Sequence, residues 1–417
     1  MSKKLTSIQE VVDAKLCSGC GACAYMQPNQ IRMENVIDEG LRPVVSPGAG
    51  DAPTDTREAL KVCPGIELEH SDLRSREGID PDLLDAWGPI LAMWEGGAAD
   101  EQVRFAGSSG GAASALAIHA LETLGFRLVV HIGADPRRPY LNRTVISRTR
   151  EEVLSRTGSR YAPASPCELL GAVEEADGPC LFIGKPCDVA AAQRARTYRP
   201  NLDRNLALTV AFFCAGTPST RGTLELLDSL QVTDVDALSD VRYRGNGWPG
   251  RFVAKSHGDQ AIRSCSYEES WGGVLSNHVQ WRCKLCLDHT GEFADVAVGD
   301  PWYRPIRDGE AGSSLIVARS QSGREYVERA IDCGALVASA VEHDLLPRSQ
   351  PNLLKTRGEV WGRLLGSRLA LAHTPRYRRL PSFRFWVSEV SADRKVRSVL
   401  GAARRCIRRR IAFKTVL

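Results

Sequence analysis

Residues 178–194 read GPCLFIGKPCDVAAAQR, and this stretch decides the fold class. The apolar run 180–183 is short and flanked by Gly and Pro, which predicts a buried strand that ends just before Cys187. The runs RLVVHIGAD (127–135) and LALTVAFFCAG (206–216) predict two further buried strands. Helical apolar spacing occurs between these strands, in residues 111–125, 167–176 and 220–230. Alternating strands and helices predict an α/β fold with a mainly parallel sheet.

Composition narrows the class of protein. The chain has 417 residues, of which 43% are hydrophobic and 25% charged, as in ordinary globular proteins. It has no apolar run near 18 residues and a polar N-terminus, so we expect neither a membrane span nor a signal peptide, and a cytoplasmic location. Thiols stay reduced there, so the 13 cysteines indicate metal or redox chemistry rather than disulfides.

The stretch CSGCGACAYMQPNQ (17–30) carries three of these cysteines in C-x2-C-x2-C spacing. Bacterial ferredoxin runs have a fourth cysteine four residues after the third, where this chain has Gln27. A remote Cys-Pro pair, Cys63-Pro64, can supply the missing ligand. The pattern predicts one [4Fe-4S] cluster, and a zinc knuckle is the alternative. Its ligands, here named the first thiol set, would be Cys17, Cys20, Cys23 and Cys63.

Four more cysteines form a second candidate site. Cys187 and Cys214 each follow a predicted strand, at the carboxyl edge where an open α/β sheet places its ligand sites. Cys283 and Cys286 form the C-x2-C chelate CKLC. Together these residues, the second thiol set, could hold another [4Fe-4S] cluster. Alternatively, Cys187 and Cys214 are small core residues and the CKLC pair binds zinc by itself.

A glycine-rich loop, residues 107–111, lies at the head of the helical run 111–125. Small residues allow a ligand to approach the backbone, and free amides at a helix start attract phosphate. A glycine-rich helix start without a ligand is the alternative reading, because the spacing differs from G-x-G-x-x-G. The candidate cofactor contacts, in this loop and beyond it, are Gly107, Ser108, Ser109, Gly110, Gly111, Tyr161, Lys185, Asn246 and Gly247.

Several motifs occur in a characteristic order: GSSGGAASALAIHAL, GSRYAPASP, FIGKPCDVAA, FFCAGTPS, YRGNGWPG and CKLCLDHTGEFADVAVGDPWY. In these motifs the chain resembles the coenzyme F420 hydrogenase/dehydrogenase beta-subunit family, over roughly residues 15–345. The resemblance implies FAD and [4Fe-4S] clusters that pass electrons between one-electron and two-electron carriers. It places Cys187, Cys214, Cys283 and Cys286 among the cluster ligands. It also places Ser109, Gly110, Gly111 and Asn246 in the flavin region.

The combined reading divides the chain into five parts. It expects a ferredoxin-like [4Fe-4S] module (1–70), a linker (71–100), an α/β flavin-binding domain (101–234), an α+β domain that completes the second cluster site (235–346) and a helical, arginine-rich C-terminal extension (347–417). Weak candidates for a general acid lie near the CKLC loop, although structural roles are the commoner fate of such residues. These are His278, Asp288, His289 and Asp300.

Three functions remain open at this stage. The first is a flavin iron-sulfur oxidoreductase with two [4Fe-4S] clusters and FAD, which acts on a small molecule with ferredoxin or coenzyme F420, itself a candidate co-substrate. The second is a non-catalytic electron-transfer subunit of a larger hydrogenase or dehydrogenase. The third is a zinc-bearing interaction protein. We expect no nucleic-acid partner.

The C-terminal tail is strongly basic. From Arg394 onward there are nine Lys and Arg and no Asp or Glu, whereas residues 1–393 carry a net charge of −5. Helical spacing places one apolar stripe on this tail, which makes peripheral contact with an anionic membrane a hypothesis. A helix docked on the acidic body, or a solvated tail, is the alternative. The stripe comprises Val396, Val399, Leu400, Ala403, Ile407 and Ile411.

Overall fold

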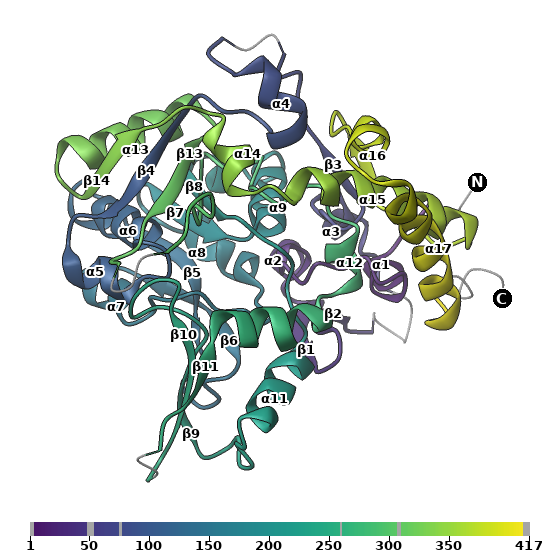
Figure 1. Ribbon diagram of the computed structural model, residues 1–417, viewed down its shortest axis with the longest axis horizontal. Helices are drawn as coiled ribbons and strands as arrows, with labels where there is room; N and C mark the ends of the chain where they lie inside the picture. Colours follow the sequence, from purple (N-terminus) through teal and green to yellow (C-terminus); the bar gives the residue numbers. More distant parts are fainter. Residues whose placement is uncertain (1–3, 48–53, 75–76, 259–260, 307–309, 412–417) are drawn as a thin grey trace.

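A mixed eight-stranded sheet forms the centre of the computed structural model (Figure 1), which describes residues 4–47, 54–74, 77–258, 261–306 and 310–411. The strands run across the sheet in the order β14-β4-β13-β12-β8-β7-β5-β6. In that order their bounds are Leu336–Ala340, Ala92–Ala98, Ser314–Ala318, Val296–Gly299, Leu206–Phe212, Cys180–Gly184, Leu128–Ala134 and Asn142–Ser147.

The predicted strands form the parallel part of this sheet. β5 pairs with β7, β7 with β8, and β8 with β12, each in parallel. Antiparallel strands flank this part on both sides, with β6 on one edge and β13, β4 and β14 on the other. The three strands expected from sequence are therefore confirmed, and the sheet is parallel at its centre and antiparallel towards both edges.

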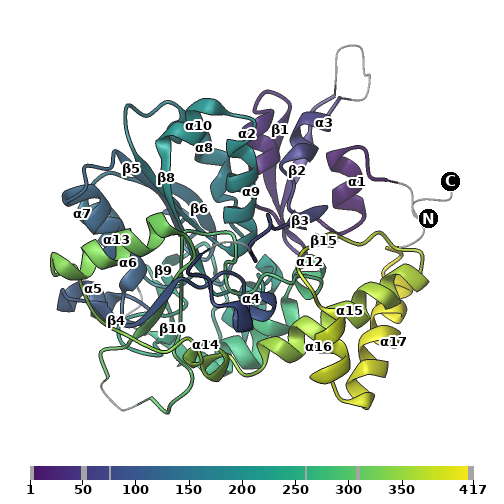
Figure 2. The same ribbon diagram turned by 90° about the horizontal axis from the view of Figure 1, so that it is seen from above.

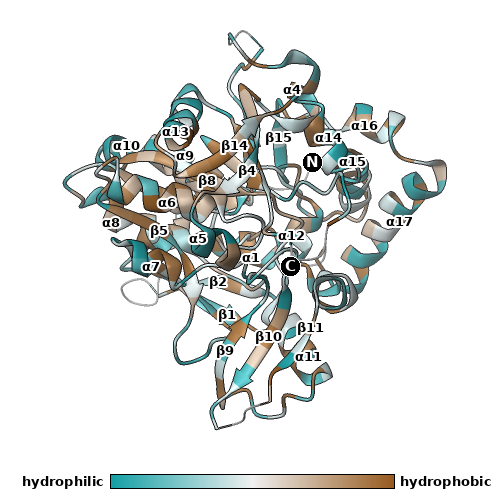
Figure 3. Cartoon of the chain, turned by 60° about the vertical axis from the view of Figure 1, so that its left-hand side comes forward, coloured by the Kyte–Doolittle hydropathy of each residue, from teal (hydrophilic) through white to brown (hydrophobic). Residues whose placement is uncertain are grey.

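Both faces of the sheet are covered, which explains the unbroken apolar runs of its central strands. Leu181 and Val210 face one core, where helix α6 (Ala112–Glu122) and helix α13 (Gln321–Asp332) pack. Phe182 and Ala211, one residue further along each strand, face the other core beneath helix α9 (Pro186–Arg196). Figure 3 shows the strands of this sheet mostly in the brown of apolar residues.

The sheet crosses two of the boundaries expected from sequence. Strand β4 lies within residues 71–100, the stretch expected to be a linker, and its Met93 and Trp94 are buried. Strands β12, β13 and β14 lie within residues 235–346 and continue the sheet of residues 101–234. Local sequence could not reveal this, because β4 reaches its partners β13 and β14 across more than 200 residues.

The remaining strands form three small sheets. The N-terminal segment contributes the antiparallel hairpin β1 (Ile31–Val36) and β2 (Gly40–Val45). β9 (Leu238–Arg242), β10 (Arg251–Ser256) and β11 (Arg263–Ser266) form a three-stranded sheet, which lies at the bottom of Figure 1. β3 (Glu67–Glu69) pairs in parallel with β15 (Arg376–Arg378), so the C-terminal extension is joined to the N-terminal segment.

Short helices complete the fold. They are α1 (Ile8–Asp13), α2 (Ala22–Met26), α3 (Arg57–Lys61), α4 (Pro81–Trp87), α5 (Glu101–Ala106), α7 (Arg150–Leu154), η2 (Pro166–Leu169), α8 (Leu170–Glu174), α10 (Pro200–Asn205), α11 (Thr220–Ser229), η3 (Glu268–Val274), η4 (Leu275–His278) and α12 (Trp281–Lys284). The extension contains α14 (Leu345–Ser349), α15 (Leu353–Leu369), α16 (Phe383–Ser388) and α17 (Ala392–Arg408). Figure 2 shows the extension and α1 at the same end of the molecule.

Helix α17 docks on α15 through small side chains rather than through the apolar stripe expected from sequence. Its buried residues are Ser398, Ala402 and Cys406, whereas Leu400 and Ile407 of the stripe are exposed. The physical reason lies in α15, where a side chain on Gly362 would come within 2.0 Å of the Ser398 hydroxyl. Close helix approach therefore selects the small residues of α17. Within the described residues, no helix combines the length and apolarity that crossing a membrane requires.

Candidate functional site

The first thiol set converges at the N-terminal segment. Cys17 and Cys20 lie on the loop before α2, Cys23 lies in the first turn of α2, and Cys63 follows α3. Two glycines in this loop adopt left-handed backbone conformations, with φ of +76° at Gly19 and +85° at Gly21. They let the chain turn tightly between successive cysteines. As a result all four thiols line one small cavity, walled by Ile8, Val11, Val12, Ala22, Met33 and Pro43.

The cavity disfavours free thiolates. Burial raises the pKa of Cys63 to about 12, with Cys20 and Cys17 adding to the rise. Burial also raises the pKa of Cys23 well above its ordinary value, and the other three thiols of the set raise it further. Thiolate ligands in this apolar enclosure therefore need a compensating cation. The chemistry of four buried, converging thiols fits a thiolate-held metal centre.

The second thiol set converges at the carboxyl edge of the parallel strands. Cys187 follows β7 and Cys214 follows the neighbouring strand β8, so the two lie together as expected. The loop after Cys214 wraps the chelate, since the Thr217 amide donates to the Cys283 sulfur at 3.4 Å. Burial raises the pKa of Cys214 to about 12, and Cys283 and Cys286 raise it further. Three chain segments distant in sequence thus meet at one place.

The two thiol sets are neighbours, joined by a cysteine that belongs to neither. The Cys167 amide donates to the Cys20 carbonyl at 3.0 Å, and the Cys167 thiol donates to the Asp188 carbonyl at 3.3 Å. A hydrogen bond from the Cys167 side chain lowers the pKa of Cys20. Asp188 directly follows Cys187 in the sequence. The pKa of the Cys187 thiol is raised in part by the charge of Cys20. A short run of contacts therefore links Cys20 with Cys187.

Arg282 lies between the same two sets. This side chain is buried, and it donates to the Pro64 carbonyl at 2.8 Å, next to Cys63. Burial lowers the pKa of Arg282, but Tyr377, Cys286 and other thiols of the second set outweigh this effect and raise it overall. The guanidinium therefore places one permanent positive charge against the second set while it anchors the loop of the first.

The described residues contain no group of three or more His, Cys, Asp or Glu side chains placed to hold a single metal ion. The assignment of the two thiol sets to [4Fe-4S] clusters therefore rests on their spacing, burial and convergence.

The candidate flavin contacts gather around a residue that sequence reasoning missed, Arg244. Its guanidinium donates to the Ser108 carbonyl at 2.9 Å and to the Tyr161 hydroxyl at 3.1 Å, and it forms a two-pronged ion pair with Asp300. The Gly247 amide donates to the carbonyl of Phe105. The loop 107–111, Tyr161 and the loop 244–250 are thus brought together, and the signal was present in the motif YRGNGWPG.

The glycines of the loop 107–111 pack against protein rather than an open cradle. A side chain on Gly110 would lie 2.9 Å from the Ser313 backbone, and one on Gly111 would lie 2.5 Å from the Val103 carbonyl. Likewise, a side chain on Gly107 would lie 2.5 Å from the backbone of Gly111. Internal packing accounts for all three glycines, so their small size does not by itself indicate a cofactor.

Lys185 belongs with the second thiol set rather than with Arg244. Its ammonium group pairs with Asp188 at 2.6 Å. Burial lowers the pKa of Lys185, but Asp188 and then Cys187 outweigh burial and raise it overall. This lysine therefore supplies one half of a buried ion pair beside Cys187, in which Asp188 raises the pKa of the thiol more than Lys185 lowers it. Sequence reasoning had placed it among the flavin contacts.

The four weak acid candidates all have structural partners. His278 pairs with Glu225 at 2.8 Å, and Asp300 accepts from Arg244 and Trp248. Asp288 caps a turn by accepting from the amides of Gly291 and Glu292. His289 contacts the Cys214 carbonyl through Nδ1 at 2.9 Å, and its buried Nε2 has no partner among the described residues. Two of the candidates therefore adjoin the second thiol set and keep a buried polar atom without a partner among the described residues. These atoms are Nε2 of His289 and one carboxylate oxygen of Asp288, whose backbone carbonyl accepts from the Cys286 thiol at 3.3 Å.

Two family models match the chain. Residues 93–170 match the coenzyme F420 hydrogenase/dehydrogenase beta-subunit N-terminal domain, and residues 179–344 match the C-terminal domain of the same subunit. The second match contains the whole second thiol set. The first thiol set and the helices α15, α16 and α17 lie outside both matches.

Similar proteins agree with this assignment. The coenzyme F420 hydrogenase subunit beta of Methanosarcina barkeri is 22% identical over 249 residues, which cover 58% of this chain and 79% of that one. The coenzyme F420-dependent sulfite reductase of Methanocaldococcus jannaschii is 22% identical over 335 residues. That alignment covers 76% of this chain, which spans about half (46%) of the reductase.

Among solved structures, a chain of the F420-reducing [NiFe] hydrogenase complex from Methanosarcina barkeri has the same fold. The TM-score is 0.53 at 20% identity, and the match covers 68% of this chain and 94% of the other. With both domain matches in sequence order and a fold in common with that hydrogenase chain, this protein belongs to the coenzyme F420 hydrogenase/dehydrogenase beta-subunit family.

Proposed function

We propose that the chain is an iron-sulfur oxidoreductase that carries electrons through two adjacent [4Fe-4S] clusters, held by the first and second thiol sets, towards FAD. The observation that carries this proposal is the contact run from Cys20 through Cys167 and Asp188 to Cys187. It joins two four-thiol groups that lie far apart in sequence. When bound, iron-sulfur clusters supply one-electron transfer.

The residues of the chain have separate tasks in this proposal. Cys63 and the three cysteines before it would hold the cluster nearer the N-terminal segment. Arg282 places positive charge beside the second thiol set, which favours the thiolate form of its cysteines and stabilises an added electron. The charge of Lys185 is matched by Asp188. Apolar walls exclude water from the first set. These features tune a redox centre more readily than they serve a purely structural zinc ion.

The glycines of the loop 107–111 are explained by internal packing, so they do not count as support for FAD. The support that remains is the family resemblance and the gathering of Ser108, Tyr161 and the loop 244–250 around Arg244. We therefore assign no reaction step to FAD. Gly110→Val is an unsuitable test, since it would clash with Ser313 whether or not FAD binds.

The electron carriers that exchange electrons with this chain are also part of the proposal. The names of the relatives suggest coenzyme F420 as one partner, and ferredoxin is the alternative carrier. A small-molecule substrate would make the chain a complete reductase. Partner subunits, as in the hydrogenase complex that shares its fold, would make it an electron-transfer subunit. Asp288 and His289 are the candidates for proton handling, because each adjoins the second thiol set and keeps one polar atom without a partner within the described residues. Burial raises the pKa of Asp288 to about 6.

The decisive experiment is anaerobic reconstitution of the full chain with iron, sulfide and FAD. We expect about eight irons per chain, from four per cluster, and one FAD that survives gel filtration. Addition of reduced ferredoxin, coenzyme F420 or NADPH in turn, followed by absorbance, identifies the carrier. Zinc binding without iron uptake would overturn the redox proposal. Reduction by a carrier without turnover of any small molecule would favour the subunit role.

Membrane contact through α17 remains a separate proposal. Val396, Leu400 and Ile407 are 56%, 63% and 54% exposed, so an apolar strip on this basic helix is accessible. The test is co-sedimentation of the full chain with anionic liposomes at low salt, with Leu400→Glu as the variant. Equal pelleting of the two proteins, or none, would reject the contact.

A further inference from the structure

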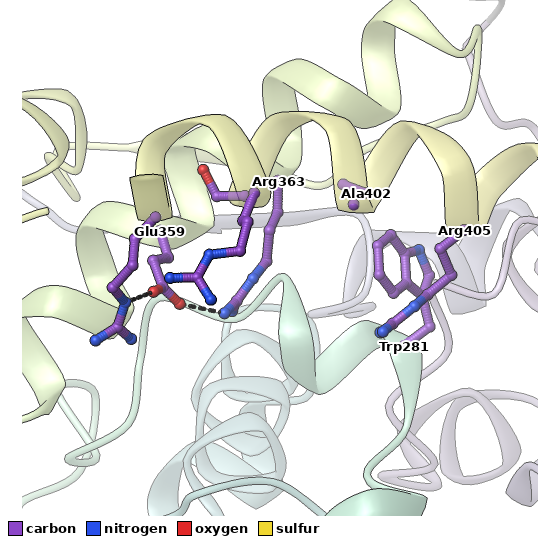
Figure 4. A pocket seen from close by; sticks show the side chains of 9 residues that line it. Trp281, Glu359, Arg363, Ala402 and Arg405 are labelled. Carbon is purple, nitrogen blue, oxygen red and sulfur yellow. Dashed lines mark hydrogen bonds and ion pairs between the residues drawn. The ribbon is translucent and has the colours of Figure 1, made fainter. Parts of the chain in front are cut away.

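A cavity of about 460 Å³ lies where α15, α17 and α12 meet (Figure 4), apart from the loops that carry the candidate flavin contacts. Its walls come from the C-terminal extension, except for Trp281 of α12. The extension residues lie outside both family matches, so the comparisons assign this cavity no role. The charged and aromatic residues that line it are Trp281, Glu359, Arg363, Arg394, Arg397 and Arg405.

Positive charge dominates this cavity. Glu359 is its one acidic wall residue, and its two carboxylate oxygens are taken by Arg363 and Arg394, each at 2.5 Å. Arg397 pairs with Asp393, whose side chain lies outside the lining. Arg405 lies over the Trp281 ring at 5.4 Å and has no carboxylate partner within the part of the chain described here. Four guanidinium groups therefore face one cavity with a single carboxylate between them.

Several hydrogen-bond donors of the cavity are unused. Each guanidinium carries five N–H groups, of which Glu359 can engage only a few. Burial, and then the nearby Arg409, lowers the pKa of Arg405, as expected where positive charge lacks compensation. A bound anion would satisfy these donors and the excess charge together.

The size and shape of the cavity select the kind of anion. Its volume lies in the range of small-molecule sites, and three helices line it, with one side open to solvent. Planar guanidinium groups recognise phosphate and carboxylate oxygens in two-pronged geometry. We propose that this cavity binds a small polyanion, either a phosphate ester or a compact polycarboxylate. The inference does not depend on the proposed electron-transfer function.

The test is isothermal titration of the full chain at low salt with pyrophosphate and, separately, with citrate. Arg405→Gln is the main variant, and Arg404→Gln is the matched control, because Arg404 is the preceding residue of α17 but is exposed and outside the cavity. Loss of one charge-assisted contact should weaken binding about tenfold or more in Arg405→Gln, and the control should match the unmodified chain. Arg397→Gln, whose side chain is 73% exposed, serves as a second variant that spares the fold.

Tighter binding of pyrophosphate than of citrate would identify a phosphate ligand, and the reverse order would identify a polycarboxylate. Absence of binding by either anion would overturn the proposal. Equal losses in Arg405→Gln and Arg404→Gln would also overturn it, because they would indicate general attraction to a basic surface.

Discussion

The two thiol sets are both buried, but they are assembled from the chain in different ways. Three cysteines of the first set lie within seven residues, on a loop that glycines bend, and one cysteine arrives from a neighbouring helix. The second set collects Cys187 and Cys214 from two strand ends and a C-x2-C pair from α12 and the residues after it. The first set is thus built by local chain geometry, whereas the second depends on the order of strands in the sheet.

The difference extends to the surroundings of each set. The C-terminal extension supports the second set through an ion pair. Arg357 of α15 pairs at 2.6 Å with Glu292, which lies in the turn that follows Cys286. Arg363, also on α15, donates to the Lys284 carbonyl at 3.0 Å. The first set contacts the extension through strand pairing and apolar packing. Strand β3, which follows Cys63, pairs with β15, and Cys17 lies in one apolar cluster with Val360 and Leu364 of α15. The extension therefore supports the second set through ion pairs and hydrogen bonds, and the first set through strand pairing and packing.

The largest effect should come from removing one ligand of either set. Cys63→Ala and Cys283→Ala should each lose about half of the iron of the reconstituted chain, since each removes one of the four thiolates that hold one cluster. Iron and sulfide analysis measures this, with the exposed Cys333→Ala as control. If either variant keeps its full iron content, the substituted cysteine is not a cluster ligand, and the comparison between the two thiol sets fails.

Breaking the ion pair behind the second set should have the next largest effect. Burial alone would raise the pKa of Glu292, but Arg357 and His70 lower it to about 2. A depressed carboxyl pKa adds stability above pH 4.5 that is lost as pH falls towards 2. Glu292→Gln should therefore cost about 3 kcal/mol of unfolding free energy at pH 7, and less at pH 4 and below.

Urea denaturation of the unmodified chain, Glu292→Gln and the control Glu175→Gln at pH 7, 5 and 4 measures this effect. Glu175 is an exposed glutamate, so its variant should follow the unmodified chain at every pH. A constant difference between Glu292→Gln and the unmodified chain across the three pH values would show that the ion pair is not the source.

A smaller effect should follow from separating α15 and α17. Gly362→Ala places a side chain 2.0 Å from the Ser398 hydroxyl, which should cost about 1 to 3 kcal/mol. Gly401→Ala on α17 meets no atom within 4 Å and should be neutral or stabilising by up to about 1 kcal/mol. Thermal unfolding compares the two variants. Equal melting temperatures would mean that α17 does not need its close contact with α15.

The smallest effect is expected at the cysteine between the two sets. Cys167→Ala should keep all iron and lose about 1 kcal/mol of stability, because it removes a buried sulfur and two weak hydrogen bonds but no ligand. Iron analysis and urea denaturation test this, with the buried Cys180→Ala as a matched control. If Cys167→Ala loses half of its iron, Cys167 is a cluster ligand, and the ligand assignment of both thiol sets must change.

Much of this protein was determined by sequence alone. The apolar runs at 127–135, 179–184 and 206–216 are strands, and the helical spacing at 111–125 and 220–230 corresponds to α6 and α11. Both signals are local, because apolar periodicity depends on residues a few positions apart. The ordered motifs also identified the family, which the domain matches confirm.

Only the tertiary structure decided which distant segments meet. No local pattern places β4 in the central sheet or Cys167 between the two thiol sets. The motif YRGNGWPG contains Arg244, but it does not show that the guanidinium joins the candidate flavin contacts. The docked face of α17 also escaped sequence reasoning, because apolar spacing marks the most hydrophobic face whereas the glycines of α15 select the smallest one. Each of these contacts depends on the shape of a partner surface, and a chain segment does not carry that shape in its own sequence.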